Sequence, residues 1–254
     1  MHIPSGTTAE LELVTFRQAL EAANTPSRDY DINKWLYAPN FYSEYRYILG
    51  TRGKKPLICI GINPSTARPD ALDNTLKSVE RIALGNGFDS FIMFNVYAQR
   101  ATNPDAMEKQ CNPLLHKENL EAFRYVLSIS QEPAVWAAWG AIIEKRKYLP
   151  ECVRDMLLAG QEYGAKWYCA GAITKKGHPH HPLYLTHGHH HSPDALPPLA
   201  EGSVFLSGHT HVKLDEVRNG IRCLNPGSVS IPKDGSNSCL VYENGVFTVR
   251  MLEE

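Results

Sequence analysis

The chain has 254 residues, and 26 Lys and Arg against 27 Asp and Glu give it a formal charge of −1 at pH 7. This balance gives no support to a polyanionic partner, because binding through charge needs an excess of basic residues. A hydrophobic content of 43% with six widely spaced cysteines and no Cys-x-x-Cys pair is typical of a globular protein with reduced thiols. No stretch has the length of a membrane span and no signal-peptide pattern is visible, so we expect a cytoplasmic protein with no membrane partner.

Residues 1–29 are expected to form an N-terminal helix. Thr7-x-x-Glu10 has the spacing of a capping box, and apolar residues follow at helical spacing. Pro26 should end the helix near residue 24.

Strands alternate with helices over the next 150 residues or so. A strand at 45–49 should form a hairpin with a buried strand at 57–62 through the loop 52–55. Further buried strands are expected at 91–96, 134–140 and 166–169, and helices at 75–86, at 116–130 and through residues 142 and 143. The alternation predicts an α/β domain over residues 30–184, a three-layer sandwich with a largely parallel sheet. In such a sheet, ligands bind beyond the carboxyl ends of the strands.

The pattern changes after residue 184 to short strands separated by turns. Asn219-Gly220 and Asn244-Gly245 are strong hairpin signals. Strands are expected at 204–206, 212–217, 221–224, 239–242 and 246–251. This change places a domain boundary near Tyr184 and predicts a β meander over residues 185–254.

Two histidine motifs mark the C-terminal part: Thr-His-Gly-His at 186–189 and Gly-His-Thr-His at 208–211. An Asn-Pro-Gly-Ser-Val-Ser run follows at 225–230. Imidazole is the commonest protein ligand of zinc, manganese and iron, and two adjacent ions can activate water and hold a phosphoryl group. In this order the motifs resemble the C-terminal half of the YfcE-like metallophosphoesterases, so we expect a β-rich half-domain of metallophosphoesterase type. The resemblance implies a hydrolase of phosphodiesterase type, acting on a small phosphoester.

The same resemblance implies that His187, His209 and His211 bind a divalent metal, Mn or Zn. The chain has no Asp-x-His, no Gly-Asp and no Asn-His, which supply the remaining ligands in such enzymes. Two ions without a bridging carboxylate would repel each other, whereas three imidazoles suit a single zinc-like ion. The expected centre is therefore incomplete, and the alternative is a set of histidines retained by descent.

A half-domain has a further consequence for assembly. It would expose a sheet edge and apolar surface, which favours a homo-dimer. The motifs of the two domains also meet within residues 181–188 without a linker, which indicates a fusion.

Four separated motifs lie in the larger domain, at 60–67, 73–75, 95–104 and 181–185. Together they resemble an uncharacterised bacterial domain family (a domain of unknown function). In the same order they are similar, more remotely, to the uracil-DNA glycosylase superfamily, which implies a glycosylase-like sheet. This resemblance implies an alternative function, the binding of a nucleotide or nucleobase at the strand ends.

By that resemblance, Asn63 would orient a water molecule, Asn95 would hydrogen-bond the base edge, and His181 would face the leaving group. Tyr97 or Tyr184 would stack on the base. Asn63 replaces the aspartate base of those enzymes, and no basic stripe accompanies the motifs, so a nucleic-acid partner has no support from charge. The structural alternatives are a strand-ending turn at Asn63 and a buried amide at Asn95 that bonds loop backbone.

Overall fold

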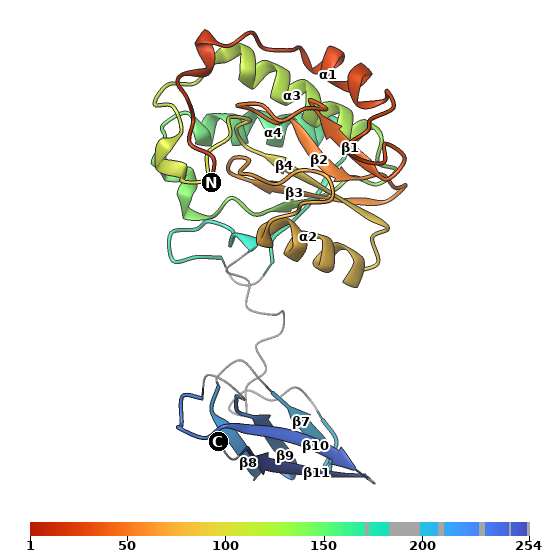
Figure 1. The fold of residues 1–254 in the computed structure, drawn as a ribbon, viewed down its shortest axis with the longest axis vertical. Coiled ribbons are helices and arrows are strands. Elements are labelled where there is room, and N and C mark those ends of the chain that lie inside the picture. The colour runs from red at the N-terminus through yellow and green to blue at the C-terminus, as the bar shows by residue number, and fades with distance from the viewer. Residues whose placement is uncertain (171–172, 183–198, 208–210, 229–231, 244, 253–254) are drawn as a thin grey trace. The chain divides into compact units, whose positions relative to one another are not determined.

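The computed structural model describes residues 1–170, 173–182, 199–207, 211–228, 232–243 and 245–252. These residues form two compact units, 1–188 and 189–254 (Figure 1). The boundary predicted near Tyr184 falls in 183–198, outside the described residues. Within the described residues, no helix is long and apolar enough to cross a membrane.

A mixed sheet forms the centre of the N-terminal unit, in the order β1-β2-β4-β3-β5-β6. Its strands are β1 (Trp35–Ala38), β2 (Ile48–Thr51), β3 (Pro56–Gly61), β4 (Ser90–Asn95), β5 (Ala134–Ala137) and β6 (Lys166–Tyr168). β3, β4, β5 and β6 run parallel, whereas β2 is antiparallel to both β1 and β4. Every residue of β3 and β4 is buried, as expected for continuous apolar runs in a sheet covered on both faces.

In the described part of this unit, the α-helices that cover the sheet are α1 (Phe16–Ala23), α2 (Asn74–Gly85), α3 (Pro113–Ser128) and α4 (Leu149–Glu162). α2 lies on one face, and α1, α3 and α4 lie on the other (Figure 1). Alternate residues of the strands accordingly enter two separate cores: Ile58 and Phe94 pack on the side of α3 and α4, and Cys59 and Met93 on the side of α2. The predicted α/β class is confirmed.

The N-terminal segment differs from its prediction. Thr7 makes no side-chain capping bond, and residues Thr8–Glu10 form only a short 3-10 helix. The capping box is instead at Thr15, whose side chain accepts from the backbone of Gln18 while the Gln18 side chain accepts from the Thr15 backbone. The predicted helix therefore begins one motif later, because a polar residue three positions after a threonine occurs twice in this segment.

The hairpin predicted between residues 45–49 and 57–62 is wrong. β2 pairs with β4, at Leu49 with Met93 and Gly50 with Ile92, and not with β3. Gly50 allows this pairing, because a Cβ atom there would lie 2.3 Å from the carbonyl oxygen of Phe91. The partner of a strand depends on contacts between residues far apart in the sequence, and the length of the connecting loop alone does not determine it.

The antiparallel direction of β2 has a consequence for function. The start of β2 lies at the edge of the sheet where the parallel strands β3 and β4 end. Just before β2, Tyr45 forms a bridge with Gln99, and the backbone N–H of Arg46 donates to Ala98 O at 2.9 Å. Arg46 is thereby brought to the edge where parallel sheets place their ligands.

The C-terminal unit contains β7 (Val204–Leu206), β8 (Lys213–Arg218), β9 (Ile221–Pro226), β10 (Ser238–Glu243) and β11 (Val246–Met251). β8–β9 and β10–β11 are antiparallel pairs, as the two hairpin signals predict. The single meander is wrong, because β9 lies between β7 and β8, with β7 and β9 parallel, and β10–β11 forms a separate sheet. Few of the unit's apolar side chains are fully buried; Ile221, Cys223 and Leu224 are among them.

Candidate functional site

A pocket of about 400 Å³ opens at the carboxyl ends of β3 and β4. Its walls come from the loop that follows β3, the first turn of α2, the end of β4, the loop near Thr102, and His181. Asn63, Asn95 and His181, the three residues predicted at this edge, all line it. The sheet brings them together because parallel strands end on one side.

Asn95, the last residue of β4, is fully buried (0% exposed), and its side chain forms no hydrogen bond with any described residue. Both its Oδ1 and its Nδ2 lack a partner. A buried amide without partners costs about 1–3 kcal/mol of stability, and native proteins rarely keep one. The structural alternative, in which this amide bonds loop backbone, therefore does not apply.

Gly61 lies opposite Asn95 in the pairing of β3 with β4 and also lines the pocket. A Cβ atom at Gly61 would lie 3.4 Å from Asn95 Oδ1 and 2.6 Å from the terminal methyl of Met93. The absence of a side chain at Gly61 thus lets the Met93 methyl and the Asn95 amide lie close to the backbone of β3.

Asn63 behaves differently from Asn95. Its Nδ2 donates to the carbonyl oxygens of Pro64 at 3.1 Å and Ala101 at 2.7 Å, so the amide group holds two loops together. Its Oδ1 takes no hydrogen bond from any described residue. The strand-ending turn is therefore present, and it leaves one acceptor in a fixed position.

His181 is largely buried, and this burial lowers the pKa of the imidazole, with the charge of Asp73 acting in the opposite direction. The ring is therefore neutral at pH 7. Tyr97, in contrast, is fully buried; its hydroxyl donates to Glu108 and accepts from the backbone N–H of Asn112 at 2.8 Å. Tyr97 does not line the pocket and is not placed to stack on a ligand, and Tyr184 lies outside the described residues.

Sequence reasoning missed two buried arginines beside this pocket. Arg46, 1% exposed, lines it and donates from Nη1 to Ala67 O at 3.1 Å. Arg100, 0% exposed, donates to Ser65 O, to Ala67 O at 3.4 Å and to the Tyr37 hydroxyl at 3.1 Å. The signal for Arg46 was a cation inside an apolar strand-like run, where a charge is rarely buried without a partner.

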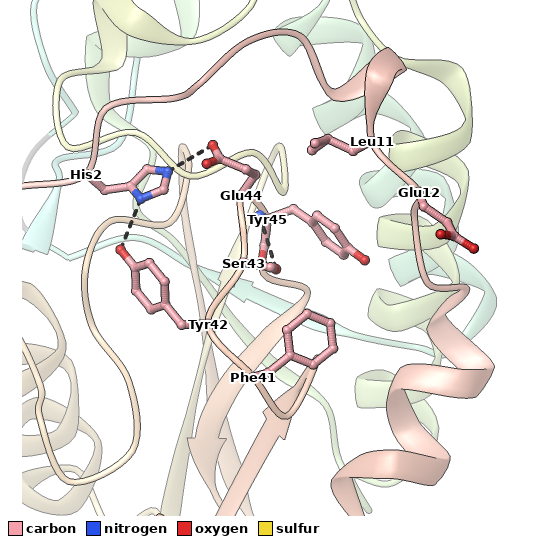
Figure 2. A pocket seen from close by; sticks show the side chains of 8 residues that line it. All are labelled: His2, Leu11, Glu12, Phe41, Tyr42, Ser43, Glu44 and Tyr45. Carbon is pink, nitrogen blue, oxygen red and sulfur yellow. Dashed lines mark hydrogen bonds and ion pairs between the residues drawn. The ribbon is translucent and has the colours of Figure 1, made fainter.

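A second pocket, of about 310 Å³, lies between the N-terminal segment and the loop 41–45. Figure 2 shows the His2 ring bonded to the Tyr42 hydroxyl at 3.1 Å and to Glu44 at 3.2 Å. The Tyr42 ring packs against Arg100, whose Cζ is 4.4 Å from the ring centroid. Arg100 thereby connects this loop with Ser65 in the wall of the strand-end pocket.

Of the three predicted metal ligands, His187 and His209 lie outside the described residues. His211 is described; its backbone has a positive φ of 60°, and its carbonyl accepts from the N–H of Lys233 at 2.9 Å. In the part of the chain that is described, no group of three His, Cys, Asp or Glu could hold a metal ion. The metal site stays a prediction.

Comparison with known proteins assigns the two parts of the chain separately. Residues 46–183 match the family described as "Protein of unknown function (DUF1643)", over more than half of the chain, and the chain belongs to this family. Residues 163–244 match the calcineurin-like phosphoesterase superfamily domain. The resemblances to an uncharacterised bacterial domain family and to the metallophosphoesterases are confirmed, whereas the more remote one to the uracil-DNA glycosylase superfamily stays a prediction.

The curated relatives all match the C-terminal part. Phosphodiesterase YfcE of Escherichia coli K12, and the same protein of strains O6:H1 and O157:H7, are each 44% identical over 73 residues. The match covers 28% of this chain and 40% of the relatives' own length. A solved phosphoesterase from E. coli, Yfce, aligns over 74% of this chain and 90% of its own with 20% identity, but its TM-score of 0.23 carries no argument.

Proposed function

We propose that the N-terminal unit binds a nucleobase-containing small molecule, a nucleotide or nucleoside, in the strand-end pocket. The observation that carries this proposal is the fully buried, unpartnered amide of Asn95 in the pocket wall. A carboxamide offers one acceptor and one donor side by side, and the edge of a nucleobase offers the complementary pair. The bound base would supply the hydrogen bonds that the protein does not.

The surrounding groups support a planar, polar ligand rather than an apolar one. His181, neutral at pH 7, adds a polar ring to the pocket wall. Asn63 Oδ1, fixed by the two bonds of its Nδ2, can hold a water molecule beside the ligand. The four parallel strands in the order β4-β3-β5-β6 support a glycosylase-like sheet. An amide is a weak base, so we propose binding and not cleavage of a glycosidic bond.

Replacement of Asn95 tests this proposal, because binding and stability should change in opposite directions. In Asn95→Leu, an apolar group of similar size removes the unpaired amide, so we expect the free energy of unfolding to rise by about 1 kcal/mol. We also expect the affinity for nucleosides, measured by calorimetry, to fall at least about tenfold, since a polar base edge would then face leucine.

Asn119→Leu is the matched control for stability. Asn119 is also a fully buried asparagine, but its Nδ2 donates to Asn95 O at 3.0 Å and to Val96 O at 3.3 Å. Its replacement should lower the free energy of unfolding by about 1–3 kcal/mol. The proposal is wrong if no nucleobase, nucleoside or nucleotide binds the wild-type chain, or if Asn95→Leu binds them unchanged.

A second candidate function, metal-dependent hydrolysis of a phosphodiester, is supported by the match of residues 163–244 and the identity to YfcE. His187, His209 and His211 would hold the ion. Three imidazoles without a bridging carboxylate fit one zinc-like ion with an open position and do not fit a two-ion centre. A bound ion of this kind lowers the pKa of its water, which supplies a nucleophile at neutral pH.

Metal content tests this candidate independently of activity. The wild-type chain, purified with added Mn²⁺ or Zn²⁺ and then dialysed, should keep about one ion, as three imidazoles can hold one. His209→Ala should lose the ion and any hydrolysis of a chromogenic phosphodiester, whereas the control His190→Ala, which replaces a histidine outside the proposed ligand set, should keep both. Equal metal in wild type and His209→Ala, or none in either, contradicts this function.

A further inference from the structure

Arg46 lines the strand-end pocket, and part of its guanidinium has no hydrogen-bond partner among the described residues. Among the described residues Arg46 makes a single side-chain hydrogen bond, from Nη1 to Ala67 O, and its buried Nε has no partner. The edge formed by Nε and Nη2 therefore donates to no group of the described residues. This planar edge has the spacing that binds two oxygens of a phosphate or carboxylate at once.

The charge of Arg46 is also not neutralised by an ion pair among the described residues, although the charge of Asp73 acts on it from a longer distance. Neither Arg46 nor Arg100 forms an ion pair with any described residue, and both are fully buried. Burial, and next the neighbouring charge of Arg100, lower the pKa of Arg46 to about 9, which leaves the side chain charged at pH 7. A buried cation without a counter-ion destabilises the fold, and a bound anion would remove that penalty.

The first turn of α2 faces the same pocket. Asn74, Thr75 and Leu76 line it, and this helix has 12 residues. Asp73 caps the N–H of Leu76 at 2.9 Å, whereas the N–H groups of Asn74 and Thr75 precede the first intrahelical bonds. Free N–H groups at a helix N-terminus favour an anion. Asp73 contributes one negative charge nearby, against the two positive charges of Arg46 and Arg100.

We propose that the strand-end pocket binds the phosphate of its ligand between Arg46 and the N-terminus of α2. The ligand is then a nucleoside monophosphate, and not a free base or nucleoside. This inference rests on the proposed function for the base, which contacts Asn95, while the phosphate site is carried by a different set of groups. Arg46 thus distinguishes phosphorylated ligands from the corresponding nucleosides.

Titration of the full chain with matched ligands tests the inference. The ligands are nucleosides, their 5′-monophosphates and inorganic phosphate, each measured by calorimetry at constant ionic strength. In the wild type we expect a monophosphate to bind at least about tenfold more tightly than its nucleoside, because two charge-assisted bonds are added. In Arg46→Met this preference should disappear while nucleoside binding remains.

Two further variants keep the test decisive if Arg46→Met does not fold. Arg46→Lys preserves the charge without the planar edge and should retain only part of the preference. Arg52→Met is the matched control, because Arg52 also donates to backbone carbonyls, Ile32 O at 2.8 Å and Trp35 O at 3.2 Å, but does not line the pocket. Its preference for monophosphates should equal that of the wild type.

The outcomes separate this inference from the proposed function. If nucleosides bind the wild type but the phosphate adds less than about twofold, the inference fails and the proposed function stands. If no base or nucleoside binds but inorganic phosphate binds and Arg46→Met abolishes this, the phosphate site stands and the proposed function fails. An unchanged preference in folded Arg46→Met, or in Arg46→Lys if only that variant folds, also overturns the inference.

Discussion

At the scale of single residues, two asparagines at neighbouring strand ends have different roles. The amide nitrogen of Asn63 donates hydrogen bonds to two loop carbonyls, whereas the buried amide of Asn95 forms no hydrogen bond with any described residue. Their residue type and position after a buried strand are alike in the sequence. Only the surrounding loop backbone, which reaches Asn63 and not Asn95, distinguishes a structural amide from one available to a ligand.

His181 makes the stability of the fold depend on pH. Its pKa is lowered in the folded chain by burial, from an ordinary value of 6.5. As pH falls below about 6.5, the unfolded chain takes up a proton at this residue before the folded chain does, so the free energy of unfolding decreases. The decrease stops below the folded-state pKa.

The contribution of His181 is measured as the difference between wild type and His181→Asn in denaturant unfolding between pH 5 and pH 8. We expect the wild type to lose more stability than the variant towards acid. An identical pH dependence in the two proteins would show that burial does not shift this imidazole.

At the scale of elements, the buried strands could be predicted and their partners could not. The runs at 57–62 and 91–96 are apolar throughout, and a strand covered on both faces requires this pattern. The pairing of β2 with β4 depends on a close approach at Gly50, which the local sequence does not reveal. The helix expected through residues 142 and 143 is the short 3-10 helix Gly140–Lys145. α4, which begins at Leu149, was not predicted, because Pro150 and Gly160 interrupt its pattern of apolar residues.

Replacement of two glycines by alanine should change stability in opposite directions, because one glycine lies in a close strand contact and the other in an open part of a helix. In Gly50→Ala the new methyl would meet the carbonyl oxygen of Phe91 at 2.3 Å, so we expect a loss of about 3 kcal/mol in the free energy of unfolding. In Gly85→Ala, at the end of α2, nothing lies within 4 Å of the new methyl. That variant should gain about 0.5–1 kcal/mol. Urea unfolding measures both, and equal effects would mean that β2 and β4 are not packed as described.

At the scale of the whole molecule, the candidate site contains residues that sequence motifs predict and one residue that only the strand topology brings there. Asn63, Asn95 and His181 could be placed together because they follow or flank parallel strands that end at one edge. Arg46 could not, because it reaches that edge in the segment just before the antiparallel strand β2. The predicted metal ligands His187 and His209 lie outside the described residues, so their prediction is neither confirmed nor wrong.

The C-terminal unit leaves apolar side chains exposed, which supports the proposal of self-association. Val217 is 69% exposed on β8, which pairs with β9 alone among the described strands. A charge on an edge strand discourages pairing with another chain. We therefore expect Val217→Lys to reduce the average mass measured by light scattering at high protein concentration.

The matched control for this effect is Leu84→Lys. Leu84 is 56% exposed, but it lies on α2 of the N-terminal unit and on no strand edge. Its replacement should leave the average mass as in the wild type. Equal masses for wild type and Val217→Lys would show that this edge does not mediate association.

The pairing of β1 with β2 determines where a fragment that contains the N-terminal unit should begin. The family match begins at Arg46, after β1 and α1 have passed, yet Phe16 of α1 and Leu36 of β1 belong to the same core as Ile58. A fragment starting at residue 46 would leave the outer edge of β2 unpaired and uncover that core. Expression boundaries for this unit therefore belong ahead of Thr15, where the capping box of α1 begins.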